Sequence, residues 1–176
     1  MVKRHKLSGK DVKELAKVLN PHLAELLKSA DDVEIYEVSE SLTLYLLDYK
    51  PLIMKISIDI NNENLEYIVP TLITLNTYPK LREYYPQVVV DDGAVPKIIN
   101  GADVMRPGIK DICGDFRKND IILVRDFRNR IISLGIAMYN RSEVESMSKG
   151  KVIKNIHYLG DKIWKLCEEL IKTSKR

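Results

Sequence analysis

The chain has 176 residues, 45% of them hydrophobic and 30% charged, and is long enough to bury a core in one compact domain or in two small ones. No apolar run approaches the roughly 20 residues that a membrane-spanning helix needs, and the basic start of the chain has no apolar segment behind it. We therefore expect a cytoplasmic protein, neither secreted nor inserted in a membrane. Only Cys113 and Cys167 occur, far apart and outside any CxxC pair, so neither a disulfide framework nor a cysteine zinc site is expected.

The net charge of +3 is unevenly distributed along the chain. Residues 1–87 carry 11 basic and 13 acidic side chains, a net charge of −2, whereas residues 88–176 carry 17 basic and 12 acidic side chains, a net charge of +5. This asymmetry points any polyanionic partner toward the second half, although a lysine-rich solvated surface would give the same count.

Two consecutive helices are expected near the start of the chain. Ser8 followed by Asp11 resembles a capping box, and apolar residues then recur at helical spacing up to Leu19. Asn20-Pro21 interrupts that helix, because proline lacks an N–H and clashes with the preceding turn. Asparagine as N-cap and proline as first residue nevertheless suit the start of a second helix.

The next segment is rich in short β-type runs. Residues 33–38, 42–47 and 52–58 are separated by polar or proline-bearing turns and predict an antiparallel meander, with a further short strand at 65–69. Pro70 to Leu75 suits either a strand or a helix, and we favour the helix because a leading proline fits a first helical turn. The aromatic, proline-containing segment 78–86 is the best boundary between two units.

The second half alternates short strands with short helices. A buried strand at 88–90 is followed by a turn, by a helix from Ala94 to Asn100 that ends at Gly101, and by a Pro107-Gly108 turn. Ser142 with Glu145 is expected to cap a later short helix. The other expected elements are paired strands at 120–125 and 131–139, a strand at 151–156 and a terminal helix at 163–171. Many short strands of this kind indicate a small barrel-like sheet.

One continuous motif is recognisable in this half. The run Val90-Asp-Asp-Gly-Ala-Val-Pro-Lys-Ile-Ile-Asn-Gly-Ala-Asp-Val-Met-Arg-Pro-Gly-Ile109 resembles the opening of PUA domains, the RNA-binding module of pseudouridine synthases and archaeosine transglycosylases. The order of elements agrees as well, down to a glycine, Gly135, inside a later strand. This resemblance implies an RNA-binding module over about Val88 to Trp164.

The whole chain is similar to the malignant T-cell-amplified sequence protein family and its archaeal relatives. The matching features include Pro70-Thr-Leu72, Tyr78-Pro79, and Asn155-Ile-His-Tyr-Leu159 followed by Asp161 and Trp164. The resemblance implies an α+β protein with an N-terminal α/β leader domain, residues 1–86, and a C-terminal PUA pseudo-barrel of short, mostly antiparallel strands, residues 87–176. It also implies a role in translation initiation or ribosome recycling. The implied partners are tRNA acceptor ends or rRNA, the small ribosomal subunit, and an initiation-factor-like protein.

In PUA domains the short helix, the strand after it and the last strand form the RNA groove. Carried onto this sequence, that role falls on a set of nine residues: Lys97, Gly101, Ala102, Asp103, Val104, Met105, Arg106, Lys151 and Lys154. The glycine would let a nucleotide backbone approach the peptide donors, and Lys97 and Arg106 would neutralise phosphates.

Each of these residues also has a plain structural explanation. Gly101 is typical of a helix C-cap, and Val104 and Met105 are typical core residues. Lys151 and Lys154 would point to opposite faces of a strand, so at most one is expected to contact RNA. The arginines at 125, 128 and 130 form either a second phosphate patch or a charged hairpin tip, and we favour the tip.

An enzyme is not expected. Asp91-Asp92 suits a turn better than a metal site, since neighbouring strand residues face opposite ways and no further ligand completes the set. Phosphate-loop, nucleophile-elbow and HExxH motifs are absent from the sequence, which suggests no cofactor, and Cys113 has no placed base. The alternatives left open are an accessory factor of ribosome biogenesis or RNA modification, and a protein-interaction adaptor.

Overall fold

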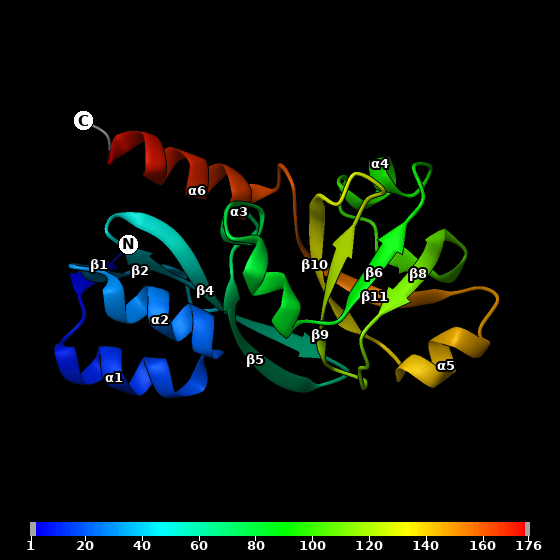
Figure 1. Ribbon diagram of the computed structural model, residues 1–176, viewed down its shortest axis with the longest axis horizontal. Coiled ribbons are helices and arrows are strands. Elements are labelled where there is room, and N and C mark those ends of the chain that lie inside the picture. Colours follow the sequence, from blue (N-terminus) through cyan, green and yellow to red (C-terminus); the bar gives the residue numbers. More distant parts are fainter. Residues whose placement is uncertain (1–2, 175–176) are drawn as a thin grey trace. The chain divides into compact units, whose positions relative to one another are not determined.

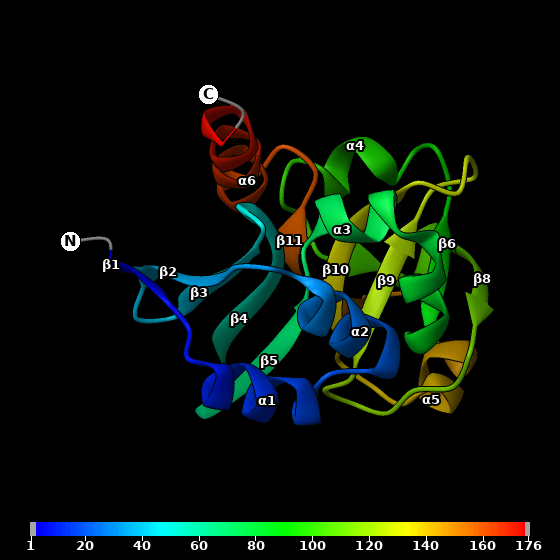
Figure 2. The ribbon, with the colours of Figure 1, turned by 60° about the vertical axis from the view of Figure 1, so that its left-hand side comes forward.

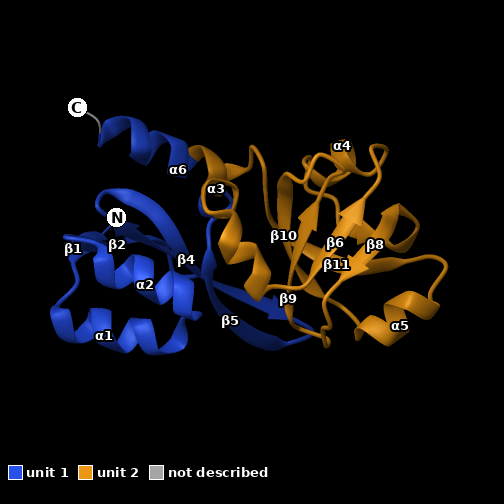
Figure 3. Ribbon diagram, in the orientation of Figure 1, with its two compact units in different colours: residues 1–74, 166–176 blue, residues 75–165 orange. Residues whose placement is uncertain are grey.

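A computed structural model describes residues 3–174, and the chain divides into two compact units (Figure 3). Unit 1 comprises Met1–Thr74 and Leu166–Arg176, and unit 2 comprises Leu75–Lys165. The domain limits 1–86 and 87–176 were inferred from the sequence and differ from the limits of the compact units. They remain a prediction. Within residues 3–174, none of the helices is long and apolar enough to cross a membrane.

The two helices at the start of unit 1 confirm the capping signals in the sequence. The helix α1 spans Gly9–Val18, and the Ser8 side chain accepts a 3.2 Å hydrogen bond from the Asp11 amide. The helix α2 spans Pro21–Ser29, and Asn20 Oδ1 accepts a 2.9 Å bond from the Leu23 amide. Side-chain acceptors of this kind satisfy amides that the first helical turn leaves without partners.

The two helices lie beside a five-stranded antiparallel sheet, whose strand order is β1-β2-β3-β4-β5 (Figures 1 and 2). The strand β1 was not predicted, because all four of its residues are polar and exposed and carry no apolar alternation. It is joined to β2 by oppositely charged pairs, such as Arg4 with Glu34 at 2.6 Å. The predicted meander is confirmed, with these strand limits: β1 Lys3–Lys6, β2 Val33–Ser39, β3 Leu42–Leu47, β4 Lys50–Ile60 and β5 Glu63–Pro70.

The ambiguous segment after Pro70 is helical, as predicted. The helix α3 spans Leu72–Thr77. The buried Thr71 and Thr74 hydroxyls donate to the carbonyls of Pro51 and Leu52 at 3.0 and 2.7 Å, which fixes the start of the helix on β4. Their β-branched side chains therefore serve packing and hydrogen bonding in a helix, not a strand.

Unit 2 contains a six-stranded sheet in the order β7-β11-β10-β9-β6-β8. All its pairings are antiparallel except the parallel pair β6–β9. Two of its strands, β7 and β8, were not predicted from the sequence. The strand β7 has only two residues, too few to be recognised. The strand limits are β6 Gln87–Val90, β7 Val104–Met105, β8 Ile109–Cys113, β9 Ile121–Arg125, β10 Ile131–Ala137 and β11 Lys151–Tyr158.

The remaining helices precede, connect or follow these strands. The α-helices are α4, Val95–Ile98, α5, Arg141–Ser146, and α6, Lys162–Thr173; the 3-10 helices are η1, Pro79–Tyr84, and η2, Arg106–Gly108. The predicted cap of α5 was wrong. Asn140, not Ser142, is the N-cap, and its amide donates to Glu143 Oε2 at 2.9 Å in a capping box. Glu145 instead forms an ion pair with Arg141 at 2.8 Å.

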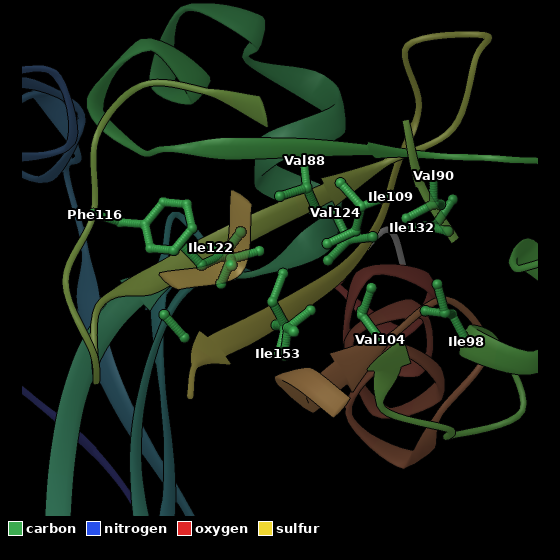
Figure 4. Close-up of a cluster of buried hydrophobic side chains, with 13 residues drawn as sticks. Val88, Val90, Ile98, Val104, Ile109, Phe116, Ile122, Val124, Ile132 and Ile153 are labelled. Carbon is green, nitrogen blue, oxygen red and sulfur yellow. The ribbon is translucent and has the colours of Figure 1, made fainter. Parts of the chain in front are cut away.

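The core of unit 2 fills the inside of the curled sheet (Figure 4). β-Branched side chains from β6, β9, β10 and β11 meet there with Ile98 of α4 and Phe116 of the loop before β9. Eleven of its thirteen buried members are valines or isoleucines, which pack well on a pleated surface. This core fixes α4 and β7 against the sheet, and these two elements carry the candidate site.

A buried polar cluster closes the end of β11. His157 is 1% exposed, and its Nδ1 lies 2.8 Å from Asp161 Oδ2. Asp161 also accepts hydrogen bonds from the Tyr158 and Trp164 amides at 3.0 and 2.7 Å, and so caps the start of α6. Burial opposes ionisation of Asp161, but the hydrogen bonds and the charge of His157 outweigh it, and the pKa of this carboxyl lies below its usual range.

Asp161→Ala is therefore expected to lower the free energy of unfolding by about 3 kcal/mol at neutral pH, because it removes a cap and leaves a buried imidazole without its acceptor. A carboxyl with a depressed pKa stabilises the fold above its unfolded pKa of about 3.9, and that contribution is lost as the pH falls through the folded value. Urea unfolding of the wild type and of Asp161→Ala at pH 7 and pH 3 measures the difference in their free energy of unfolding. Equal stability at pH 7, or a difference that grows on acidification, would contradict it.

Candidate nucleic-acid interface

A cavity of about 610 Å³ lies where α4, β7, η2 and the start of β11 meet. Five of the nine predicted site residues line it: Lys97, Ala102, Asp103, Met105 and Lys151. Six further lining residues had not been assigned to the site, namely Asp91, Gly93, Ala94, Ile98, Pro107 and Gly108. All six lie inside the Val90–Ile109 motif, so the motif as a whole was the signal that located them. We call this cavity the α4 groove.

The turn at Asp91 sets the start of α4. Asp91 Oδ1 accepts a 2.9 Å bond from the Ala94 amide, and Oδ2 lies 3.2 Å from Lys110 Nζ. The Ala94 amide and the Lys110 ammonium lower the pKa of the Asp91 carboxyl. The turn interpretation of Asp91 is confirmed by these contacts. No group of three potential metal ligands occurs among residues 3–174.

The end of α4 differs from the expected open cradle of peptide donors. Gly101 has φ +95°, a left-handed conformation, and a Cβ there would lie 3.0 Å from the Tyr158 hydroxyl oxygen. Its amide donates to the Ile98 carbonyl, and the Ala102 amide donates to the Lys97 carbonyl, both at 3.0 Å. These two donors complete the helix C-cap and so are not free for a ligand.

Lysine side chains at two positions supply positive charge to the α4 groove. Lys97 projects from α4 and is exposed. Lys151 begins β11, opposite Met105 of β7, and its Nζ lies 3.5 Å from Asp103 Oδ2. The carboxylate of Asp103 also accepts the Asn155 amide at 2.9 Å, so it is held in place beside Lys151.

The inner surface of the groove is mostly apolar. Met105 is 45% exposed despite its size, and Ile98 and Pro107 contribute further apolar surface. An exposed thioether beside two ammonium groups suits a ligand that combines a flat ring with an anionic group. Such a ligand would place the ring on the apolar surface and the anion at the rim.

The other four predicted site residues lie outside the lining of the groove. Val104 is fully buried in the core. Arg106 donates from Nε to the Val144 carbonyl at 2.6 Å and from Nη1 to the Ile109 carbonyl at 3.3 Å, so its guanidinium fastens α5 to β8. Lys154 pairs with Ile136 of β10, and Gly101 shapes the helix end. Of the two lysines on β11, only Lys151 reaches the groove.

Asn155 belongs to one of the motifs shared with the family, but the sequence predicts no role for it. Its side-chain amide donates to the carbonyls of Ile98 and Ala102 at 2.9 and 3.0 Å, and its Oδ1 accepts the Ser133 hydroxyl at 2.7 Å. It therefore ties the end of α4 to the sheet. Only the fold shows this, because the contacts join residues more than 50 positions apart.

Comparison with known proteins identifies the module. The PUA domain family matches residues 86–159. An uncharacterized protein of Methanocaldococcus jannaschii is 37% identical over 167 residues, which cover 92% of this chain and 95% of that protein. The chain belongs to the family of PUA-domain proteins. The resemblance to PUA-domain proteins of the malignant T-cell-amplified sequence type and the predicted α+β fold class are confirmed.

This PUA protein is similar along most of its length to proteins of yeast, rat and an archaeon. Translation machinery-associated protein 20 of Saccharomyces cerevisiae is 26% identical, over 93% of this chain and 87% of that protein. Malignant T-cell-amplified sequence 1 of Rattus norvegicus is 25% identical, over 83% and 77% of the two chains. Among solved structures, a hypothetical protein of Pyrococcus horikoshii OT3 superposes with a TM-score of 0.74 at 33% identity, over 94% of this chain and 99% of that chain. The similarity thus covers both halves.

Proposed function

We propose that this PUA protein binds RNA of the translation machinery in the α4 groove and catalyses no reaction. The observation that carries the proposal is the groove itself, an apolar cavity of about 610 Å³ with Lys97 and Lys151 at its rim. The name of the yeast relative, translation machinery-associated protein 20, supports a place in translation. We further propose that the bound RNA is a tRNA acceptor end, the small ribosomal subunit, or both, during initiation or recycling.

The shape of the groove favours an unpaired nucleotide. In a duplex the bases are stacked and paired, and the deep major groove of RNA excludes side chains. An unpaired end can place one base on Met105 and its neighbours, with its phosphates near the two lysines. The single-stranded end of a tRNA has this chemistry, so it fits better than a continuous helix.

The remaining parts of the proposal concern location and partners. A cytoplasmic protein that meets the small ribosomal subunit would satisfy the same chemistry, since rRNA also offers unpaired ends and loops. Unit 1 would then be free to hold an initiation-factor-like protein. Cosedimentation of the tagged protein with small subunits, and not with precursor particles, would separate this role from one in ribosome assembly.

Lys97→Glu should weaken binding of deacylated tRNA about tenfold at 100 mM salt, because it replaces an exposed cation at the groove with an anion. The slope of log K against log salt should also fall by about one unit. Fluorescence anisotropy of labelled tRNA over a salt series measures both quantities.

Lys118→Glu provides the matched control. Lys118 is also exposed and lies in the same unit. It precedes β9, whereas the groove follows β6. Because β6 and β9 run parallel, Lys118 and the groove lie at opposite ends of these strands. Its variant should bind within about twofold of the wild type. Equal losses in the two variants would show a nonspecific charge effect and would contradict the placement of the site in the groove.

A further inference from the structure

The loop between β9 and β10 is a rigid hairpin tip, residues 125–130. Asp126 is 5% exposed, and its Oδ1 accepts the amides of Arg128 and Arg130 at 3.1 and 2.9 Å. The Asp126 amide donates to the Arg130 carbonyl at 3.1 Å, and Asn129 adopts a left-handed φ of 61°. The Arg82 guanidinium, from η1, donates to the Asn129 carbonyl at 2.8 Å. The loop is thus held from within and from its neighbour.

This tip is rich in positive charge. Among the residues hydrogen-bonded within it or to it, four are arginines, at 82, 125, 128 and 130, and Asp126 is the one acid. Asp126 pairs with Arg130 at 3.1 Å. Arg82 and Arg125 hydrogen-bond mainly to neutral oxygens, and burial together with the charge of Arg125 lowers the pKa of Arg82. An anion near the tip would relieve this repulsion between cations.

The tip also presents an aromatic side chain to solvent. Phe127 is 59% exposed, the largest exposed fraction among the aromatic residues of the part that the structure describes. Its neighbour Arg128 is exposed, and its amide, not its side chain, is bonded to Asp126. An exposed ring next to an arginine offers a stacking surface for a base and a cation for its phosphate. The hydrogen bonds of Asp126 explain the conformation of the loop. They do not explain why the side chains of Phe127 and Arg128 are exposed.

The topology of unit 2 brings the tip and the α4 groove to the same end of the sheet. Strands β6 and β9 run parallel, so their carboxyl ends share one edge. The turn into α4 follows β6, and the tip follows β9. The strand β10, which begins directly after the tip, also contacts α4. One extended RNA strand can therefore approach both features from a single side.

We propose that Phe127 and Arg128 form a second contact for the same RNA, in which a single-stranded nucleotide outside the α4 groove stacks on the phenyl ring and places its phosphate at the guanidinium. This inference rests on the proposed RNA-binding function. Positive charge and an exposed ring on a rigid loop favour single-stranded RNA over a protein partner, because an unpaired base offers both a flat face and an adjacent anion.

The test compares three variants by anisotropy with deacylated tRNA and with a single-stranded RNA of about 20 nucleotides. Phe127→Ala should weaken binding of both RNAs about tenfold, since one stacked base contributes a factor of this order. Arg128→Ala should lower the salt slope by about one unit. Arg117→Ala is the matched control, an exposed arginine that precedes β9 and so lies at its other end, and it should leave affinity and slope unchanged. Circular dichroism verifies that each variant is folded.

The outcomes separate this inference from the proposed function. If Lys97→Glu weakens binding and Phe127→Ala does not, the tip inference fails and the groove stands. If Phe127→Ala weakens binding and Lys97→Glu does not, the groove assignment fails and the tip stands. No binding of either RNA by the wild type overturns both. With benzoylphenylalanine in place of Phe127, crosslinks to RNA in cell extract support the inference, and crosslinks to protein alone overturn it.

Discussion

Gly135→Ala is expected to lower the free energy of unfolding by about 3 kcal/mol, although it adds a single methyl group. Gly135 lies in β10, and the register of β10 against β11 shifts between Leu134 and Gly135. A Cβ at this position would overlap Cγ2 of Ile153 and lie 2.9 Å from the Lys154 carbonyl oxygen. Ile153 is fully buried, and the carbonyl belongs to the backbone of the paired strand, so neither can move without a local change in the sheet.

Gly9→Ala is the matched control for this prediction. Gly9 opens α1, and no atom lies within 4 Å of the position that its Cβ would take. Alanine favours helix over glycine, so this variant should be unchanged or slightly more stable. Urea unfolding of the three proteins gives the comparison. A Gly135→Ala protein as stable as the wild type would show that the close approach of β10 and β11 does not restrict this position.

The double variant Lys97→Glu with Lys151→Gln should lower the affinity for deacylated tRNA about 100-fold, the largest binding effect we expect. Both lysines line the α4 groove, and Lys97→Glu reverses a charge where a phosphate would lie. Glutamine is chosen at position 151 because glutamate there would lie next to Asp103, 3.5 Å from the present ammonium, and would disturb the site by repulsion. The salt slope should fall by about two units.

A second double variant controls for the loss of charge. Lys118→Glu with Lys149→Gln changes the net charge by the same amount at two lysines outside the groove lining. It should bind tRNA within about threefold of the wild type. An unchanged affinity in the groove variant at low salt would contradict the proposed site, since the electrostatic contribution is greatest there.

Elements with strong local signals could be predicted from the sequence. The helix starts at Ser8 and Asn20 depend on side chains only three residues from the amides they accept, so the pattern is local. The meander from β2 to β5 was predictable because short turns join strands that are neighbours in sequence. By contrast, β1 has no apolar face, and it becomes a strand only by pairing with β2 about 30 residues later.

The candidate site was predictable as a motif but not residue by residue. Arg106 has the residue type expected of a phosphate contact, yet carbonyls of Val144 and Ile109 occupy its guanidinium. The Gly101 and Ala102 amides close the end of α4 and do not face a ligand as free donors. Asn155 gains its role from contacts across the sheet. The contacts of Arg106 with Val144 and of Asn155 with Ile98 are long-range, and spacing in the sequence does not encode them. The bonds of the Gly101 and Ala102 amides are local and belong to the helix C-cap that a glycine at this position also predicts.

The most direct test of RNA binding in the α4 groove is a titration of the ¹⁵N-labelled protein with a tRNA acceptor-stem minihelix that carries a single-stranded 3′ end, followed by NMR. We expect the largest chemical-shift changes at the amides of α4, of β7 and of the first residues of β11, and little change when the single-stranded end is removed. Shift changes confined to unit 1, or identical changes with the blunt minihelix, would contradict the account.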